Sequence, residues 1–240
     1  MSIAVERRLD GRIAVITGAS RGIGAAVAKR FASEGAEVVL VARTVGGLEE
    51  VDDEIRAAGG KASTLVPFDM TDFPAIDRLG GVIAERHGRL DILVGNAAIL
   101  GGLRPTGHFP PDEWERVMAV NVTANWRLIR CFDALLRASD AGRVTFVTSS
   151  AAAMAIPYWG AYAASKAALE SMVRIYAAEV DKTSLRVNLL DPGAVRTRMR
   201  AEAMPGEDPL TLTHPDDIAG TFVDLSAPNC RRYGDIVRAY

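Results

Sequence analysis

The segment "IAVITGASRGIGAAVAKRF" (residues 13–31) decides the fold. It begins as a β-branched apolar run, passes through Gly18, Gly22 and Gly24, and continues with the pattern of an alanine-rich helix. Glycines at such a strand-to-helix turn permit a tight bend, a close approach of the backbone to a diphosphate, and close packing of the helix on the sheet. The spacing is G-x-x-x-G-x-G rather than the commoner G-x-G-x-x-G, and flexible surface loops also contain glycines. The position of the loop between strand and helix favours dinucleotide binding.

The rest of the chain alternates β-rich runs with helical patterns. Strands are predicted at residues 12–16, 37–41, 62–66, 91–95, 143–147, 186–190 and 235–239. Most of these runs are continuously apolar, which is typical of strands covered on both faces. Helices are predicted through Val27 and Phe31 to Gly35, through Leu48, Val51 and Ile55 to Gly59-Gly60, from "PPDEW" (110–114) to about Arg137, over roughly 161–180, and from about 215. This alternation predicts one α/β domain over residues 1–240, with a parallel sheet, right-handed crossovers and helices on both faces.

Composition excludes several classes of protein. The chain has 240 residues, of which 49% are hydrophobic and 24% charged, as in an ordinary soluble globular protein. A net charge of −2 gives no electrostatic reason to expect nucleic acid or a membrane as partner. Two cysteines cannot form a disulfide framework or a zinc ribbon, and the three histidines lack metal-ligand spacing, so no metal site is expected.

The location in the cell is predicted from three further features. Residues 1–12 are charged from position 6 and have no apolar core, so they do not read as a secretory signal. The least polar stretch, residues 151–164, is too short to span a bilayer and contains Pro157 and Gly160. With the low cysteine content, these features predict a cytoplasmic protein.

The end of the second predicted strand bears on the choice of dinucleotide. NAD-binding folds commonly carry an acid here that holds the adenosine ribose, but this strand ends in Ala42 and Arg43, with no acid before Glu49. An arginine would pair with a 2′-phosphate, and Arg21 in the glycine loop is a second candidate for the same contact. Both arginines could instead be solvated loop residues. The pattern favours NADP(H) and leaves NAD(H) as the alternative.

A tyrosine and a lysine stand four residues apart in "YAASK" (162–166). This spacing places Tyr162 and Lys166 on one helix face, about one turn apart. An isolated pair of this kind is usually two half-buried amphipathic residues. It indicates a catalytic role only if the rest of the chain supplies a site on which the pair can act. A serine hydrolase is a poor alternative, because Ser149 and Ser150 lack a G-x-S-x-G elbow and no histidine is evidently placed as a partner.

Taken in order, these motifs resemble those of the short-chain dehydrogenase/reductase family. They are the glycine loop, "GNAA" (95–98), Asn121, "TSS" (148–150), "YAASK" (162–166) and "DPGAVRT" (191–197). Each is weak alone, but together they are specific, and the resemblance runs from about residue 10 to the end. It implies a doubly wound, Rossmann-like fold with a seven-stranded parallel sheet. It also implies a homodimer or homotetramer formed through two long central helices.

The resemblance implies roles for individual residues in catalysis. Tyr162 is similar to the catalytic acid/base, and Lys166 to its partner, which also grips the nicotinamide ribose. Ser149 takes the position of the serine that binds substrate, with Ser150 as second choice. Asn121 resembles the asparagine that holds a water in the proton relay.

The resemblance also implies a set of cofactor contacts. Asp69 resembles the residue that receives the adenine amino group, and Thr197 the threonine that contacts the nicotinamide carboxamide, with the backbone near Ala194 alongside. The complete set is Gly18, Ser20, Arg21, Gly22, Ile23, Gly24, Arg43, Asp69, Met70, Asn96, Lys166, Pro192, Gly193, Val195 and Thr197. The chain departs from the family at Ala98, where many members have glycine, and in its ending "DIVRAY", which replaces a common Val-Asp-Gly-Gly tail.

The chemistry of the implied catalytic residues can be argued from their types. Reduction of a carbonyl by hydride builds negative charge on the substrate oxygen, and a proton must reach it. A tyrosine with its ordinary pKa near 10 exchanges protons poorly at neutral pH. A lysine ammonium and an oxidised nicotinamide are expected to lower that pKa by about 3, which requires about 4 kcal/mol. Ser149 would donate a hydrogen bond to the developing oxyanion.

The substrate is constrained less than the chemistry. Ile156, Tyr158 and Trp159 lead into Tyr162 and are expected either to wall the pocket or to pack against a neighbouring helix or subunit. The segment 198–214, with Pro205, Gly206 and Pro209 in place of a strong helix pattern, is expected to form a short lid that carries Met199 and Met204.

The expected function is an NADP(H)-dependent oxidoreductase that interconverts a carbonyl and an alcohol, with a medium-sized, partly apolar ketone or aldehyde as substrate. The alternatives are a dinucleotide-binding regulatory protein without turnover, or the same chemistry with NAD(H).

Overall fold

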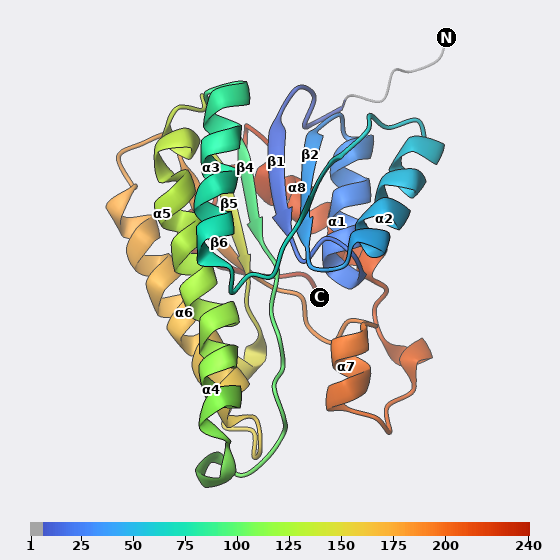
Figure 1. Cartoon of the computed structure of the whole chain (residues 1–240), viewed down its shortest axis with the longest axis vertical. Coiled ribbons are helices and arrows are strands. Elements are labelled where there is room, and N and C mark those ends of the chain that lie inside the picture. Colours follow the sequence, from blue (N-terminus) through green and yellow to red (C-terminus); the bar gives the residue numbers. More distant parts are fainter. Residues whose placement is uncertain (1–6) are drawn as a thin grey trace.

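The computed structural model describes residues 7–240, so the interpretation of the N-terminal sequence falls partly on residues outside this range. Within it, seven strands form one sheet in the order β3-β2-β1-β4-β5-β6-β7, and every pairing is parallel (Figure 1). The strands are β1 Ile13–Thr17, β2 Glu37–Ala42, β3 Thr64–Pro67, β4 Ile92–Gly95, β5 Arg143–Val147, β6 Arg186–Asp191 and β7 Ile236–Arg238. The chain winds outward from β1 to β3, then reverses through β4. The predicted doubly wound, Rossmann-like sheet is therefore confirmed.

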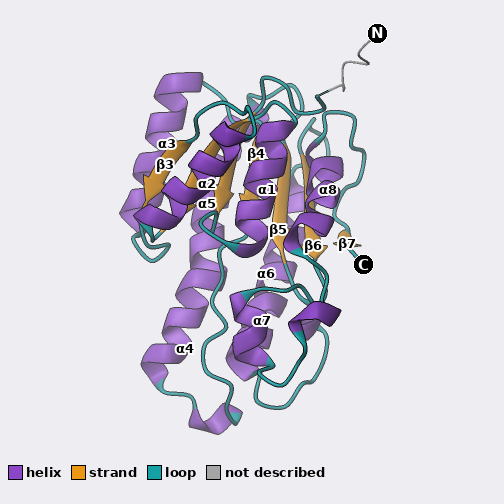
Figure 2. Cartoon of the chain, turned by 90° about the vertical axis from the view of Figure 1, so that its right-hand side faces the viewer, coloured by secondary structure: helices purple, strands orange, loops and turns teal. Residues whose placement is uncertain are grey.

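Helices cover both faces of the sheet (Figure 2). They are α1 Gly22–Ser33, α2 Val45–Ala57, α3 Phe73–His87, α4 Pro111–Met118, α5 Ala124–Arg137, α6 Gly160–Glu179, α7 Arg198–Ala203 and α8 Pro215–Ser226. Figure 1 shows α3, α5 and α6 on one face and α1, α2 and α8 on the other, with α7 beyond the ends of the strands. No helix over residues 7–240 combines the length and the apolar character needed to cross a bilayer.

The two helical layers bury two hydrophobic cores, one on each face of the sheet. Along β1, Ala14 and Ile16 face the core that contains Phe31 of α1. Ile13 and Val15 face the other core. Because alternate side chains of a strand point to opposite faces, a strand buried on both sides must be apolar at every position. This explains the continuous apolar runs that marked the strands in the sequence.

Two elements differ from the sequence-based expectation. No helix was predicted at α3, yet Asp72 caps it by accepting a hydrogen bond from the Ala75 backbone N–H at 3.0 Å, and Pro74 lies in its first turn. Both are helix-start signals, and the cap stabilises the helix by about 1 kcal/mol. The helix predicted to run from "PPDEW" to Arg137 is not uniform, because residues Ala119–Thr123 between α4 and α5 form a π-helical segment.

Smaller differences lie at the edges of elements. The strand predicted at 62–66 is observed at Thr64–Pro67, β5 has its predicted bounds, and the ends of the other strands differ from prediction by at most one residue. The segment 198–214, read as lacking a strong helix pattern, contains the short α7 and one 3₁₀ turn at Pro209–Thr211. Thr197 starts α7 by accepting a hydrogen bond from the Arg200 backbone N–H at 3.2 Å.

Candidate active site

A cleft of about 1050 Å³ lies at the carboxyl ends of the central strands and extends toward α7. In a doubly wound sheet this is the edge at which ligands bind. Eighteen of the predicted site residues line it: Gly18, Ser20, Arg21, Gly22, Ile23, Arg43, Asp69, Met70, Asn96, Ser149, Trp159, Tyr162, Lys166, Pro192, Gly193, Val195, Thr197 and Met199. Gly24, Asn121, Ile156 and Tyr158, which the structure also describes, do not line it.

The glycine loop has the geometry that a diphosphate requires. Gly18 and Gly22 have φ angles of +67° and +57°, in the left-handed region that side chains disfavour. A Cβ on Gly24 would collide with the carbonyl oxygen of Gly18, so Gly24 shapes the loop rather than lining the cleft. Because α1 begins at Gly22, its first backbone N–H groups lie beside the cleft. These features fit the diphosphate of a dinucleotide.

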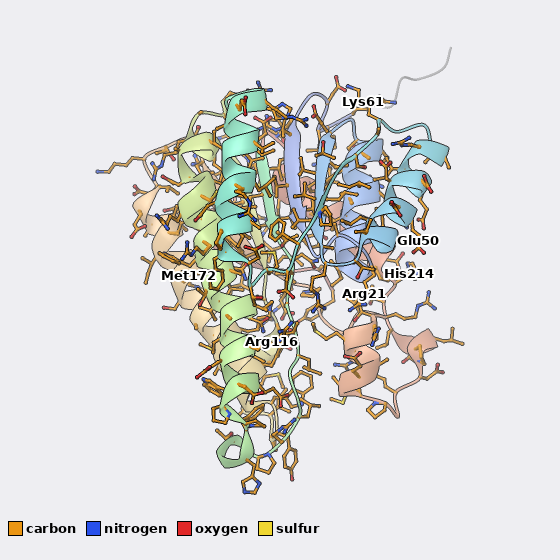
Figure 3. The ribbon with its side chains drawn as sticks, viewed as in Figure 1. Arg21, Glu50, Lys61, Arg116, Met172 and His214 are labelled. Atoms are coloured by element: carbon orange, nitrogen blue, oxygen red, sulfur yellow. The ribbon has the colours of Figure 1, made fainter. Side chains whose placement is uncertain are left out.

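Cations lie where the sequence predicted a phosphate contact. Arg43 follows β2 with its side chain 53% exposed, and its Nη1 lies 3.7 Å from Oδ2 of Asp69. Figure 3 shows Arg21 near the start of α1, facing α7, with His214 close by. Both Arg21 and His214 line the cleft. Two arginines in the lining of one cleft are suited to an anionic group such as a phosphate.

Asp69 is fixed in the same part of the cleft. Its Oδ1 accepts hydrogen bonds from the Thr71 backbone N–H at 2.9 Å and the Thr71 hydroxyl at 2.8 Å. Arg116 of α4 approaches its Oδ2 at 3.3 Å. Partial burial acts to raise the pKa of Asp69, but these hydrogen bonds and the charges of Arg116 and Arg43 lower it overall. The carboxylate is therefore ionised and held in place.

Tyr162, Lys166 and Ser149 come together at the inner end of the cleft. Tyr162 and Lys166 lie on consecutive turns of α6, and Ser149 lies just beyond the end of β5. Lys166 Nζ lies 5.6 Å from the centroid of the Tyr162 ring and donates a hydrogen bond to the Val147 carbonyl at 2.8 Å. The Ser149 side chain lies close enough to Tyr162 to act on the pKa of its hydroxyl, which it lowers. Tyr162 and Lys166 are 8% and 2% exposed, so both functional groups are largely shielded from water.

Within the chain alone, burial sets the protonation of this pair, whereas the lowered pKa expected for Tyr162 depends also on an oxidised nicotinamide. Burial raises the pKa of Tyr162 to about 12, against the lowering effect of the Ser149 side chain, and the charge of Asp191 adds to the rise. Burial also lowers the pKa of Lys166 to about 8, against the charge of Glu170. Desolvation disfavours both ionised forms, and within the chain alone it outweighs the attraction between ammonium and phenolate. The phenol is therefore neutral at pH 7 and able to donate its proton.

Asn121 is fully buried in the π-helical segment, beside the cleft rather than in its wall. Its side chain accepts a hydrogen bond from the Ile99 N–H at 2.9 Å and donates to the Ile99 carbonyl and the Ser165 hydroxyl, also at 2.9 Å each. Its backbone carbonyl accepts from the Asn125 side chain at 2.8 Å. Asn121 thus anchors the loop after β4. The water-holding role stays a prediction, for which the carbonyl has a second lone pair.

The expected substrate wall is only partly formed as predicted. Trp159 lines the cleft and packs edge-to-face on Tyr162, with ring centroids 5.9 Å apart. Ile156 packs against a small apolar cluster that includes Tyr162, but it does not line the cleft. Tyr158 instead is 59% exposed, with a φ of +73° that is rare outside glycine. Of these three residues, Trp159 alone faces the cleft.

The cleft also includes residues that sequence reasoning missed. Among them are Leu100, Thr148, Ala203 and His214. Thr148 and Leu100 lie close to the "TSS" and "GNAA" motifs, so proximity to a motif was a usable signal. Ala203 and His214 lie in the segment 198–214 that was expected to form a lid, but neither residue was named individually.

The segment after Thr197 is pinned by an ion pair. The Arg200 guanidinium contacts the two carboxylate oxygens of Glu207 at 2.5 and 2.7 Å, which closes the turn from α7 to the 3₁₀ segment. Met199 lines the cleft, whereas Met204 is 37% exposed. That this segment acts as a lid stays a prediction.

The match to a family model agrees with this fold and site. The family model of short chain dehydrogenases matches residues 12–208. The chain therefore belongs to the short-chain dehydrogenase family.

Individual relatives match over nearly the whole chain. The oxidoreductase YciK of Escherichia coli is 38% identical over 226 residues, covering 93% of this chain and 89% of its own. A short-chain dehydrogenase structure from Pseudomonas syringae has a TM-score of 0.95 at 36% identity, covering 98% of this chain and 97% of its own. A short-chain dehydrogenase structure from Escherichia coli, complexed with NADPH, has a TM-score of 0.93 at 37% identity, covering 98% of both chains.

Proposed function

We propose that this protein is an NADP(H)-dependent oxidoreductase that interconverts a carbonyl and an alcohol, with Tyr162 as acid/base. The observation that carries the proposal is the meeting of Ser149, Tyr162 and Lys166 in the cleft that also contains the glycine loop. A phenol, an ammonium and a hydroxyl converge on one side of the cleft, and the phosphate-binding geometry lies on the other. This arrangement suits proton transfer beside a bound dinucleotide.

The choice of NADP(H) rests on the adenosine end of the cleft. Arg43 and Arg21 both line the cleft and would pair with a 2′-phosphate, and the second strand ends without the acid expected of an NAD site. The NADPH complex of the Escherichia coli relative supports the same choice. The glycine loop would hold the diphosphate, and Lys166 and Thr197 would lie at the nicotinamide end. When bound, the cofactor would supply the hydride.

The residues of the chain then handle the proton and the developing charge. In the direction of reduction, the carbonyl carbon gains a hydride and its oxygen gains the proton of the Tyr162 hydroxyl. Ser149 would donate a hydrogen bond to the same oxygen as its charge develops. The positive charge of Lys166 stabilises the phenolate that is left, and solvent then restores the proton to Tyr162.

Several finer expectations belong to this proposal. The substrate end of the cleft is bordered by Leu100, Trp159, Met199 and Ala203, which suits a medium-sized, partly apolar ketone or aldehyde. We expect a homodimer or homotetramer, because the family commonly assembles through its central helices. A cytoplasmic location stays a prediction from the cysteine content and the N-terminal sequence.

The proposal is tested by mixing the protein with NADPH and a panel of ketones, aldehydes and oxoacyl thioesters, with NADPH oxidation followed at 340 nm. Turnover of at least one carbonyl, with NADPH preferred over NADH, is the expected result. Tight NADPH binding without turnover across the panel would favour a regulatory dinucleotide-binding protein. Preference for NADH would retain the chemistry and overturn the cofactor assignment.

A further inference from the structure

Three consecutive residues at the end of β5, Val147, Thr148 and Ser149, each lie against one turn of α6. The Ser149 side chain lies close to Tyr162 and acts to lower the pKa of its hydroxyl, against the larger effect of burial. The Val147 carbonyl accepts a hydrogen bond from Lys166 Nζ at 2.8 Å. The Thr148 hydroxyl donates a hydrogen bond of 2.6 Å to Oε1 of the third α6 side chain, Glu170, which sequence reasoning did not single out.

The hydrogen bond between Thr148 and Glu170 joins two well-fixed elements. Thr148 is 2% exposed, and its backbone N–H donates to the Leu190 carbonyl of β6 at 2.8 Å. Ser149 is the next residue and leaves the sheet toward the cleft. A hydrogen bond to a carboxylate is among the stronger ones in proteins. It fixes the strand end from which Ser149 reaches Tyr162.

Glu170 also bears on the charge of Lys166. The two residues are separated by four positions on α6, so they lie on the same helix face. Burial removes Lys166 from water, and Glu170 supplies an opposing negative charge. Asp191, at the end of β6, acts on Tyr162. Arg174, four positions after Glu170 on α6, lines the same surface hollow as Glu170.

We propose that Glu170 is a positioning residue of the active site, whose carboxylate holds Thr148 beside Ser149 and whose charge keeps Lys166 protonated. The proposal rests on the proposed function, because it assigns Glu170 a part in the same chemistry. Glu170 acts from behind the cleft and touches neither substrate nor cofactor. Two consequences can be measured separately: the titration of Lys166 and the placement of Ser149.

The first test needs no turnover. The chain has only four lysines, Lys29, Lys61, Lys166 and Lys182, so lysine labelled with carbon-13 at Cε gives few NMR signals to follow through a pH titration. Lys166→Met identifies the Lys166 signal by its loss. In Glu170→Gln, Lys166 should titrate at lower pH than in the wild type, whereas in Glu179→Gln, the matched change at the exposed end of α6, it should titrate unchanged. An unchanged titration in Glu170→Gln would overturn the electrostatic part.

The second test measures positioning by kinetics. Thr148→Val removes the hydroxyl and keeps the charge of Glu170, and it should lower kcat/KM for the carbonyl about ten-fold. Thr148→Ser keeps a hydroxyl and should restore most of the activity. Combined with Glu170→Gln, Thr148→Val should cost less than the sum of the separate effects, because both changes break the same hydrogen bond.

Additive losses, or full activity in Thr148→Val, would overturn the positioning part. Thermal unfolding and NADPH binding, measured on each variant, show whether a loss of activity merely follows a loss of stability or of cofactor affinity. If the wild-type protein reduces no carbonyl, the proposed function fails, and the lysine titration still decides whether Glu170 controls the charge of Lys166.

Discussion

The ammonium of Lys166 lies over the ring of Tyr162, 5.6 Å from its centroid, while its proton is donated to the Val147 carbonyl. The pair is buried before any ligand contributes, and burial keeps the phenol neutral and weakens the hold of Lys166 on its proton. A buried, marginally charged lysine is costly to stability and useful for proton transfer. The predictions below follow from this relationship and from the shape of the cofactor loop.

Replacing Lys166 with methionine should abolish turnover and stabilise the fold. The pKa of Lys166 falls from 10.5 to about 8 on folding. Because the unfolded chain holds this proton more tightly, wild-type stability should rise as pH increases from about 8 toward 10.5. Keeping the lysine charged at pH 7 costs up to about 3 kcal/mol. Urea unfolding at pH 7 and pH 9.5 measures both effects, and an equal rise with pH in Lys166→Met would contradict the assignment to Lys166.

The pH dependence of cofactor capture should report the same lysine. We expect kcat/KM for NADPH, which reflects ionisations of the free enzyme, to fall above about pH 8 as Lys166 loses its charge. Tyr162, with a pKa of about 12, should stay protonated through this range and contribute no loss. A stopped-flow or steady-state profile from pH 6 to 10 checks this. A flat profile to pH 10 would show that the charge of Lys166 is not needed for capture.

Arg43→Ala should weaken NADPH binding about ten-fold or more and leave NADH binding nearly unchanged, since only NADPH carries the 2′-phosphate. The loss should shrink at high salt, because Arg43 is half-exposed and its charge is screened. Fluorescence titration with each nucleotide gives the two dissociation constants. Arg78→Ala, an exposed arginine paired with Asp72, serves as the control. An equal loss for both nucleotides would place Arg43 elsewhere in cofactor binding.

Gly24→Ala should disrupt the cofactor loop, because its Cβ would strike the Gly18 carbonyl oxygen. Gly46 in the first turn of α2 offers a matched control, since a Cβ there meets nothing within 4 Å. Gly46→Ala should be neutral or stabilising by up to about 1 kcal/mol, as expected for alanine in a helix. Thermal unfolding and NADPH titration compare the pair. Unimpaired NADPH binding in a folded Gly24→Ala protein would contradict the role given to the loop.

The strands and most site residues could be predicted because short stretches of sequence indicate them. The strands followed from apolar runs such as Ile13–Thr17, because burial on both faces demands them, and the parallel direction of the sheet followed from strand–helix alternation. Most of the residues that line the cleft followed from the resemblance of the motifs to those of the short-chain dehydrogenase/reductase family. The α3 helix was missed although Asp72 and Pro74 signal its start and its buried residues Ile76, Leu79 and Ile83 repeat at helical spacing.

Other features depend on tertiary structure and left no local signal. The π-helical segment occurs at Asn121, whose side chain is hydrogen-bonded to the backbone of Ile99 in the loop after β4. The raised pKa of Tyr162 reflects burial, which a spacing of four residues does not reveal. The hydrogen bond between Thr148 and Glu170 joins residues 22 positions apart. Sequence analysis gave neither residue a role, although Thr148 is part of the "TSS" motif.

The most direct test of the central claim is single-turnover hydride transfer from bound NADPH in the wild type and in Tyr162→Phe, using a carbonyl that the wild type reduces. The variant keeps the ring that packs on Trp159 and lacks only the proton. We predict that NADPH binds the variant with wild-type affinity and that the rate of transfer falls at least about a thousand-fold, the range expected for loss of a general acid. A transfer rate in Tyr162→Phe equal to that of the wild type would contradict the account.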